Sequence, residues 1–437
     1  MESQLELEQH QCQPQHQQSR QRVFRPLPPG LIQLLLILAV FVFMKLNSIY
    51  LNKVRHSRFS PNEKGHIPLE HFFLAYFDCR KNKRNKKEAV DFEVNYEREL
   101  IKLWREVNNE IYKVSPLDVF ISEKPVKREI FAAQFRDRIV HHLVVNKLEY
   151  ILEKEFIFDT HSCRKGRGVH FAINRTKRHI RQCSKNYTED CYILKLDIKG
   201  YFMSIDRAIL LNNLENLINQ KYFSKDKNKL IYLLRTIINN NSIKSCICKS
   251  PKEKWIGLPK SKSLFYAKDN CGLPIGNYTN QVLANLYLTP LDHFIKHNLK
   301  IKHYVRYVDD LVLIHRDKEQ LKVEMSLIKN YLEKELNLLI HPKKIYLQHY
   351  QKGAEFLGVL IKPYRSYVTR RIKNNSYQAI RNINISLKEE KLDVDIILSR
   401  INSYLGLLSH SNTYNLKKKI LNKLDPKVWD FLLLAKN

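Results

Sequence analysis

The sequence predicts an α+β fold, on the basis of three observations. Short apolar runs bounded by polar sequence, which are typical of buried strands, occur at 191–197 and on both sides of residues 309–310. Apolar residues recur at helical spacing in 92–112 and 136–152. The Lys-rich C-terminal part, about 370–437, is also helical in pattern. Both helices and strands are therefore expected in this chain.

Composition limits the kinds of partner that the chain can have. It has 437 residues and is 44% hydrophobic, which is enough for a large core and long for a single domain. Lys and Arg outnumber Asp and Glu by 75 to 44, and the formal charge of +31 favours a nucleic acid or an anionic membrane surface as partner. The eight cysteines are scattered and lack the framework of a small secreted domain. Free thiols in a reducing compartment are therefore expected.

The N-terminal extension consists of two unlike parts. Residues 1–22 are rich in Gln, His and Glu and are expected to be disordered. The apolar run 31–46 follows, with basic residues on both sides. A spanning helix needs about 18 or more apolar residues, so this shorter run leaves a membrane tether, a buried helix and an over-long N-terminus open. The sequence thus predicts a cytoplasmic location, with membrane association through 31–46 as an open alternative.

Asp197 stands at the end of the first apolar strand, in CYILKLDIKGYF (191–202). A carboxylate at the end of a buried strand is costly unless a cation neutralises it, so Asp197 is expected to bind one. The chain then turns at Gly200, and a helix is expected to begin with Ser204 or Asp206 as its cap.

Asp309 and Asp310 lie between two β-rich runs in HYVRYVDDLVLIH (303–315), the pattern of a hairpin with two acids at its tip. Such a pair alone is most often an ordinary solvated turn, but the apolar flanks, Asp197 and the net charge argue against that here. Three neighbouring carboxylates remain ionised together only around bound cations. Mg²⁺ prefers oxygen ligands and also takes phosphates, so a pair of ions about 3.5–4 Å apart is expected.

Six ordered motifs, found from about residue 70 to about 420, resemble those of reverse transcriptases. Three of them are similar to the palm motifs of that family and the others to its fingers motifs and primer-grip strand. They are LDIKGYFMSI (196–205), GLPIGNYTNQVLANLYLTPLD (272–292), YVDD (307–310), KPVKREIFAAQFRDRIVHH (124–142), DTHSCRKGRGVHFAI (159–173) and EFLGVLIKP (355–363).

The resemblance implies a right-hand polymerase fold with fingers, an α+β palm and a helical thumb. It implies an RNA-directed DNA polymerase, a nucleotidyltransferase that copies an RNA template into cDNA from dNTPs with two Mg²⁺ ions, for which Mn²⁺ can substitute. The expected partners are the RNA template and an RNA/DNA duplex. The expected regions are an N-terminal extension (1–60), N-terminal helices and fingers (61–190), a palm (191–365) with a polar insertion (about 239–265), and a thumb (366–437).

The resemblance also implies roles for individual residues. Asp197, Asp309 and Asp310 would be the catalytic metal ligands, with the backbone carbonyl of Ile198 as a further ligand. Phe202 would be the steric gate that favours dNTPs. Further nucleotide-binding residues would be Lys124 or Lys127 beside Arg128, then Gly272, Pro274, Ile275, Gly276 and Gln281, and Lys343 or Lys344 near the pyrophosphate. The primer grip would comprise Phe356, Leu357 and Gly358. Asn280 departs from the Ser of many bacterial relatives.

The sequences FRDRIVHH, CRKGRG and PIGNYTNQ resemble most the corresponding segments of bacterial retroelement enzymes. Among these they are most similar to diversity-generating retroelements and to the related unclassified and abortive-infection groups. Two roles follow: mutagenic cDNA synthesis with a small accessory protein, or antiphage defence with a noncoding RNA. A non-catalytic scaffold that binds nucleic acid is a third reading, although such a protein would be free to lose its three acids. A homo-oligomer is left open.

Overall fold

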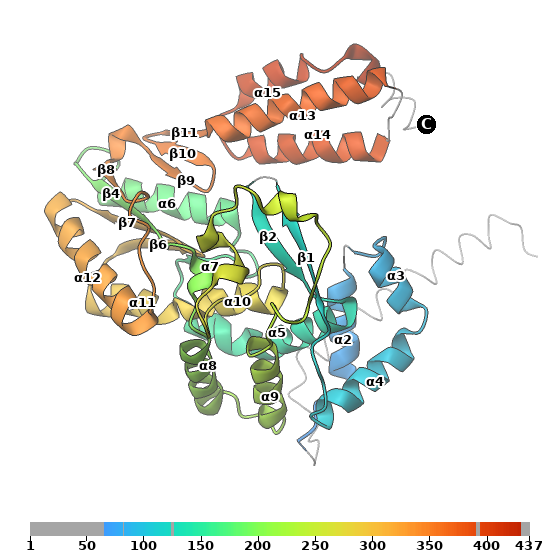
Figure 1. Cartoon of the computed structure of the whole chain (residues 1–437). Helices are drawn as coiled ribbons and strands as arrows, with labels where there is room; N and C mark the ends of the chain where they lie inside the picture. The colour runs from blue at the N-terminus through green and yellow to red at the C-terminus, as the bar shows by residue number, and fades with distance from the viewer. Residues whose placement is uncertain (1–64, 82, 124–125, 390–393, 430–437) are drawn as a thin grey trace, which may run out of the picture. The chain divides into compact units, whose positions relative to one another are not determined.

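The computed structural model describes residues 65–81, 83–123, 126–389 and 394–429, and Figure 1 gives their arrangement. The N-terminal extension expected over 1–60 lies outside these ranges, and so does Lys124.

The prediction of membrane association requires a correction. Within the described ranges, no helix is both long enough and apolar enough to cross a membrane. The run 31–46, on which the prediction depended, lies outside the described residues. The predicted membrane association therefore has no support from the residues that the structure describes.

A five-stranded sheet in the order β3-β6-β7-β4-β8 forms the centre of the palm. β6 pairs with β7, and β4 pairs with both β7 and β8, all antiparallel, whereas β3 pairs with β6 in parallel. The strand and the hairpin predicted from the sequence are therefore confirmed. The strands are β3 (Thr160–His161), β4 (Tyr192–Asp197), β6 (His303–Tyr307), β7 (Asp310–His315) and β8 (Tyr346–His349).

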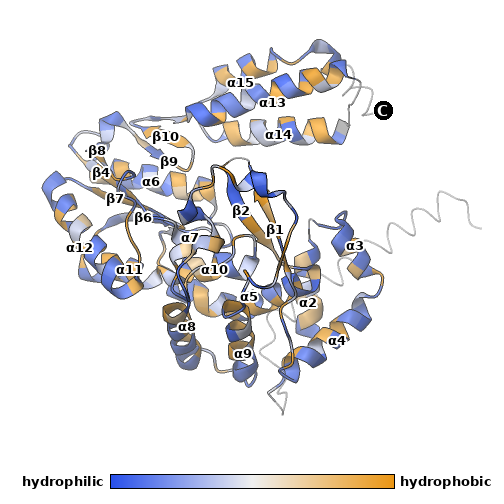
Figure 2. Cartoon of the chain, viewed as in Figure 1, coloured by the Kyte–Doolittle hydropathy of each residue, from blue (hydrophilic) through white to orange (hydrophobic). Residues whose placement is uncertain are grey.

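Both faces of this sheet are covered, which explains why its strands read as continuous apolar runs. Along β7, Leu311 and Leu313 join the larger core, whereas Val312 and Ile314 join a second core on the opposite face. α12 (Lys318–Leu336) and α10 (Tyr278–Tyr287) belong to the larger core, and α6 (Val169–Cys183) to the second. In Figure 2 the helices alternate between hydrophobic and hydrophilic residues, as amphipathic helices do.

Four helices of the N-terminal part pack into the larger core. The helix predicted over 136–152 is confirmed as part of α5, but the one predicted over 92–112 is two helices. They are separated at Val94 and Asn95, and Asn95 is the N-cap of the second, a place that suits this residue better than a helix interior. The four are α2 (Leu69–Arg80), α3 (Lys87–Glu93), α4 (Tyr96–Asn108) and α5 (Phe135–Glu155).

The fingers contain a second sheet in the order β2-β1-β5. β1 (Leu117–Ser122) and β2 (Arg128–Ala132) form an antiparallel hairpin, and β5 (Cys246–Cys248) adds to β1 in parallel. β5 comes from the predicted polar insertion, and three 3-10 turns follow it. They are η1 (Lys252–Trp255), η2 (Lys260–Lys262) and η3 (Leu264–Tyr266).

Three helices follow β4. Of the two caps proposed for the second of them, the structure uses Asp206, whose carboxylate accepts from the backbone N–H groups of Ala208 (2.9 Å) and Ile209 (3.2 Å). The three are α7 (Tyr201–Ser204), α8 (Arg207–Lys221) and α9 (Lys227–Ile238). Between α10 and β6 lie α11 (Thr289–His293) and the π-helical turn η4 (Phe294–Asn298).

The C-terminal part begins with a small antiparallel sheet and ends in helices with an apolar core of their own. The predicted helical pattern is confirmed for the described residues. The elements are η5 (Tyr350–Lys352), β9 (Ala354–Phe356), β10 (Val359–Lys362), β11 (Arg365–Val368), α13 (Arg370–Lys388), α14 (Val394–Ser409) and α15 (Tyr414–Leu421). With fingers, palm and thumb, the fold is the α+β right-hand polymerase fold that the sequence predicts.

Candidate active site

The hairpin β6–β7 and its neighbour β4 bring the three predicted acids together. Asp197 and Asp310 are direct partners across β4 and β7. Tyr307 pairs with Asp310 across the hairpin, so that Val308 and Asp309 alone form its turn. One carboxylate at a strand end, a second opposite it and a third on the adjacent turn form a single cluster.

The backbone of this turn is held in an uncommon conformation. Val308 has φ +55°, which is rare for a β-branched residue and costs energy unless its surroundings enforce it. Its carbonyl accepts a hydrogen bond of 3.1 Å from the guanidinium of Arg306. Arg306 therefore fixes the turn that carries Asp309.

Arg306 is completely buried beneath the turn, where Asp292 is its ion-pair partner at 2.6 Å. It also donates to the side-chain oxygen (2.8 Å) and the carbonyl (3.0 Å) of Asn285. Tyr304 and Thr160 donate to the same aspartate, each at 2.7 Å. A buried ion pair is tolerated when its remaining donors and acceptors are satisfied, as they are here. Sequence reasoning did not single out Arg306, although a charge inside the apolar run 303–307 was the available signal.

Simultaneous ionisation of all three carboxylates is strongly unfavourable. Burial raises the pKa of Asp309 to about 7, and the nearby charges of Asp310 and Asp197 add to the effect. Burial also raises the pKa of Asp310, although the ammonium of Lys195 opposes this shift. A cation bound among them would restore the ionised forms.

Two lysines reach these carboxylates. Lys344 Nζ lies 2.8 Å from Asp197 Oδ2. Lys343, which the sequence put forward with it, forms no ion pair with the three acids in the described part of the chain. Lys195 Nζ lies 3.3 Å from Asp310 Oδ1 and also donates to the carbonyl of Glu355 in β9 at 3.3 Å. Sequence reasoning missed Lys195, because a single lysine in a strand resembles any solvated side chain.

The donor set suits hard divalent cations, since it consists of carboxylate oxygens. In the ranges that the structure describes, however, no three Asp, Glu, His or Cys side chains are already arranged to hold a metal ion. Ions would have to displace Lys344 from Asp197 and Lys195 from Asp310. Ile198 and Ile340 face each other in an isolated antiparallel bridge. The backbone hydrogen bonds of this bridge are made by Asp197 and Lys199, so the Ile198 carbonyl takes part in neither of them.

The predicted nucleotide-binding cations lie on the fingers. Arg128 is exposed at the first residue of β2. Lys127 donates to the carbonyl of Ile256 at 2.6 Å and so holds the insertion rather than standing free for a phosphate. Among the described residues, neither forms an ion pair with the three acids. The structure therefore brings the acids together but leaves these cations apart from them.

The glycines of the 272–276 loop approach protein atoms. Gly272 and Gly276 have φ +96° and +123°. A Cβ on Gly272 would lie 2.5 Å from Leu264 Cδ1, and one on Gly276 would lie 2.9 Å from Ile130 Cγ2. The close approach at these two glycines, which the sequence put forward as nucleotide-binding residues, packs the loop against the fingers and the insertion.

Backbone bonds join this loop to its neighbours. The carbonyl of Ile275 accepts from the N–H of Phe131 in β2 at 2.7 Å. The carbonyl of Phe202, which is half-buried, accepts from the N–H of Leu273 at 2.8 Å. The carbonyl of Pro274 accepts from Asn280, and Gln281 is exposed on α10. The loop therefore connects the fingers strand to the turn beyond Asp197.

The predicted primer-grip residues form the tip of a tight hairpin between β9 and β10. Phe356 is completely buried, while Leu357 and Gly358 make the two-residue turn with φ +51° and +83°. The carbonyl of Gly358 accepts from the N–H of Thr369 at 3.0 Å. A Cβ on Gly358 would lie 2.6 Å from Ile372 Cδ1, so the tip packs against the start of α13.

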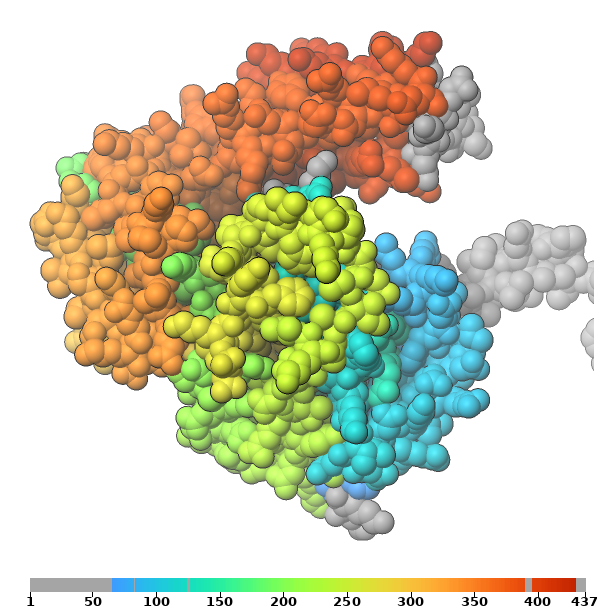
Figure 3. All heavy atoms as spheres, in the orientation of Figure 1, coloured from blue at the N-terminus to red at the C-terminus, as the bar shows by residue number. Residues whose placement is uncertain are grey.

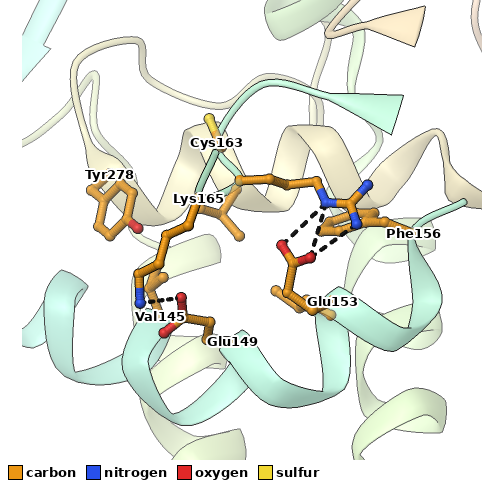
Figure 4. A pocket seen from close by; sticks show the side chains of 10 residues that line it. Val145, Glu149, Glu153, Phe156, Cys163, Lys165 and Tyr278 are labelled. Atoms are coloured by element: carbon orange, nitrogen blue, oxygen red, sulfur yellow. Dashed lines mark hydrogen bonds and ion pairs between the residues drawn. The ribbon is translucent and has the colours of Figure 1, made fainter. Parts of the chain in front are cut away.

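A pocket of about 270 Å³ lies between α5, residues 163–165 and α10 (Figure 4). Lys165 and Glu149 form an ion pair on its wall, and Arg164 and Glu153 form another. None of the three acids of the candidate site lines it. The pocket is therefore separate from the carboxylate cluster.

Comparisons with known proteins identify relatives. Residues 124–361 match the family model described as reverse transcriptase (RNA-dependent DNA polymerase). The putative COX1/OXI3 intron 2 protein of Saccharomyces cerevisiae is 24% identical over 63% of this chain and 35% of its own length. The group II intron-encoded protein LtrA of Lactococcus lactis subsp. cremoris is 22% identical over 69% of this chain and 56% of its own. The chain thus spans between about a third and just over half of these relatives.

Solved structures of telomerase are similar at low identity. Apo telomerase from Candida tropicalis has a TM-score of 0.45 at 13% identity, over 73% of this chain and 61% of that one. Telomerase from Candida albicans, solved with a fragment of telomeric RNA, has a TM-score of 0.43 at 10% identity, over 74% and 59%.

The family assignment depends on the sequence match. Residues 124–361 are more than half of the chain, and they include the three acids of the candidate site and Phe356. The chain belongs to the reverse transcriptase (RNA-dependent DNA polymerase) family.

Proposed function

We propose that the chain is an RNA-directed DNA polymerase that copies an RNA template into cDNA by two-metal nucleotidyl transfer. The observation that carries this proposal is the pairing of Asp197 with Asp310 across β4 and β7, with Asp309 on the turn between β6 and β7. Family membership and the charge of +31 support a nucleic-acid substrate.

In this proposal the acids of the cluster hold two divalent ions. When bound, a pair of Mg²⁺ ions activates a primer 3′-hydroxyl and stabilises the leaving pyrophosphate. Asp197 and Asp309 are the principal ligands, Asp310 supports them, and the Ile198 carbonyl is a further donor. Lys344, at 2.8 Å from Asp197, replaces Lys343 as the residue that would donate a proton to the pyrophosphate.

Other residues bind and select the nucleotide. Arg128 offers two guanidinium N–H groups to triphosphate oxygens. Phe202 excludes a ribose 2′-hydroxyl, and Leu357 with Gly358 supports the primer strand. Lysines of the thumb neutralise duplex phosphates without reading sequence.

Primer extension by the purified full chain on an RNA template, with dNTPs and Mg²⁺, tests the proposal. Extension by the native chain and its loss in an Asp309→Asn/Asp310→Asn variant are expected. Equal extension by both would assign the activity to a contaminant and overturn the site. No extension by the native chain, on a panel of primed and unprimed templates, would favour a non-catalytic scaffold.

We further propose that the polymerase serves an element of the diversity-generating type and acts with a small accessory protein. The support is the resemblance of the segments FRDRIVHH, CRKGRG and PIGNYTNQ to those of diversity-generating retroelement enzymes. Antiphage defence with a dedicated noncoding RNA is the alternative. Sequencing the cDNA made in cells separates them: scattered substitutions against the template are expected for the first role, and faithful copies of one noncoding RNA would indicate the second.

A further inference from the structure

We propose that residues 244–268, here called the lysine segment, bind the single-stranded part of the template beside the active site. This inference rests on the proposed function and extends it to a second region of the protein that binds nucleic acid. In templated copying, the nucleic acid behind the reacting end is a duplex and the template ahead of it is single-stranded. The lysine segment has the charge, the exposed rings and the firm attachment that suit a single strand.

The charge of the lysine segment is almost entirely of one sign. Its only acid is Glu253. In the part of the chain that the structure describes, Lys249 alone among its lysines forms an ion pair, with Asp118 at 3.5 Å. Exposed lysines of this density attract a phosphate backbone without regard to sequence. The seven exposed lysines are Lys244, Lys249, Lys252, Lys254, Lys260, Lys262 and Lys268.

Exposed rings lie among these lysines. Tyr266 is 62% exposed and Phe265 is 38% exposed. Lys260 Nζ lies 5.3 Å from the centre of the Tyr266 ring, which keeps a cation beside an aromatic face. Unpaired bases stack on such rings while neighbouring cations follow the backbone, and this combination distinguishes a single strand from a duplex.

A buried carboxylate fastens the lysine segment to the fingers. Glu129, which is completely buried in β2, accepts hydrogen bonds from Trp255 Nε1 (2.6 Å), Ser263 Oγ (2.8 Å) and the backbone N–H of Leu264 (2.6 Å). β5 adds a strand pairing with β1. Lysines that only keep a surface soluble need no such attachment, whereas a preformed surface binds at a lower entropic cost.

The lysine segment also touches the turn beyond Asp197. A Cβ on Gly200 would lie 2.5 Å from the carbonyl oxygen of Ser261, and one on Gly272 would lie 2.5 Å from Leu264 Cδ1. Figure 3 shows the yellow-green atoms of this part of the chain on the face turned toward the viewer. A strand bound here would therefore lie next to the nucleotide-binding elements.

The test measures binding without catalysis, by fluorescence anisotropy of the full chain in EDTA. Two labelled probes share one RNA/DNA duplex. In one the duplex is blunt, and in the other the RNA extends by ten unpaired nucleotides at its 5′ end. A variant with Lys252, Lys254, Lys260 and Lys262 each changed to Gln removes four charges from the lysine segment. Its matched control removes four from α12, at Lys318, Lys322, Lys329 and Lys334.

The native chain is expected to bind the extended probe at least tenfold more tightly than the blunt one. The lysine-segment variant should bind the two probes almost equally. The slope of its log affinity against log salt should be shallower by about 0.7 for each phosphate that its side chains no longer neutralise. Tyr266→Ala should weaken the extended complex about fivefold or more while Tyr266→Phe does not. An unchanged melting temperature confirms that each variant is folded.

Three results would overturn the inference. If the lysine-segment variant and the α12 control lose the same affinity for both probes, overall charge and not a local surface explains binding. If the variant retains the preference for the extended probe, the template lies elsewhere, while the proposed polymerase stands. Failure of the native chain to bind either probe would reject the proposed function and this inference together.

Discussion

Among the three acids of the site, Asp309 is the one with the most strongly shifted pKa. Burial and two neighbouring carboxylates raise its pKa to about 7, so near neutral pH a proton and a metal ion compete for it. The turn that holds it depends on Arg306, and the cluster is partly neutralised by Lys344 and Lys195. Each of these residues has a distinct measurable consequence.

Asp309→Asn is expected to stabilise the metal-free protein by about 1–3 kcal/mol at pH 7. The folded-state pKa lies above the unfolded value of 3.8, so the folded state binds the extra proton and native stability falls as pH rises from about 4 to about 7. The variant does not show this fall, and its advantage over the native chain should grow across that window and stay constant above it. Urea unfolding of both proteins at each pH measures the difference.

The comparison between the two proteins is needed because buried histidines act in the opposite direction. Burial lowers the pKa of His141 to about 3 and that of His161 to about 4, which makes stability rise with pH in part of the same window. These contributions cancel in the difference. A difference that is independent of pH would contradict the account of Asp309.

Lys344→Met is expected to separate metal binding from catalysis. Because Lys344 competes with metal for Asp197, the Mg²⁺ concentration for half-maximal rate should fall severalfold. Removal of the proposed proton donor should lower kcat by about 100-fold. Single-turnover incorporation over a Mg²⁺ series gives both values, with Lys343→Met as the matched control. Equal effects of the two substitutions would show that Lys344 has no specific role in the site.

Arg306→Met is expected to destabilise the fold by about 3–5 kcal/mol, since it leaves Asp292 buried without its partner. Arg306→Lys keeps the charge but cannot reach all the acceptors of the guanidinium, so the turn should loosen. At equal folded fraction, this second variant should be at least tenfold slower in incorporation while binding duplex as the native chain does. Native incorporation rates in Arg306→Lys would show that the turn needs no such support.

At the scale of elements, the β9–β10 hairpin connects the palm to the thumb through its tip. Gly358→Ala is expected to cost about 1–3 kcal/mol, because φ is +83° and the new Cβ would lie 2.6 Å from Ile372 Cδ1. Displacement of Ile372 should weaken duplex binding more than it slows incorporation at saturating duplex. Gly406→Ala, in α14 and with open space around it, is the control. Equal duplex affinity in both variants would exclude this connection.

The sequence predicted the elements that carry strong local patterns. The strand ending at Asp197, the hairpin around Asp309 and the long helix α5 follow from apolar periodicity alone. The break at Asn95 and the strand β5 inside the insertion did not follow, because each depends on packing partners distant in sequence. For the same reason, Glu129 reads as an ordinary surface acid until the structure places it beneath the lysine segment.

At the scale of the whole molecule, the three acids could be predicted because their residue types and strand positions are determined by local sequence. The cations around them could not, since Lys195, Lys344 and Arg306 matter only through contacts across the sheet. The charge of +31 favours a polyanion as partner, in line with the proposed function, but it says nothing about which surface would bind it.

Single-nucleotide incorporation in one turnover, on an RNA/DNA primer–template, tests the central claim most directly. Asp197→Asn is compared with Asp190→Asn, an exposed aspartate that precedes the same strand. The account predicts that Asp197→Asn lowers the rate by at least 1,000-fold while duplex affinity is unchanged, and that Asp190→Asn incorporates at the native rate. Incorporation by Asp197→Asn within tenfold of the native rate would contradict it.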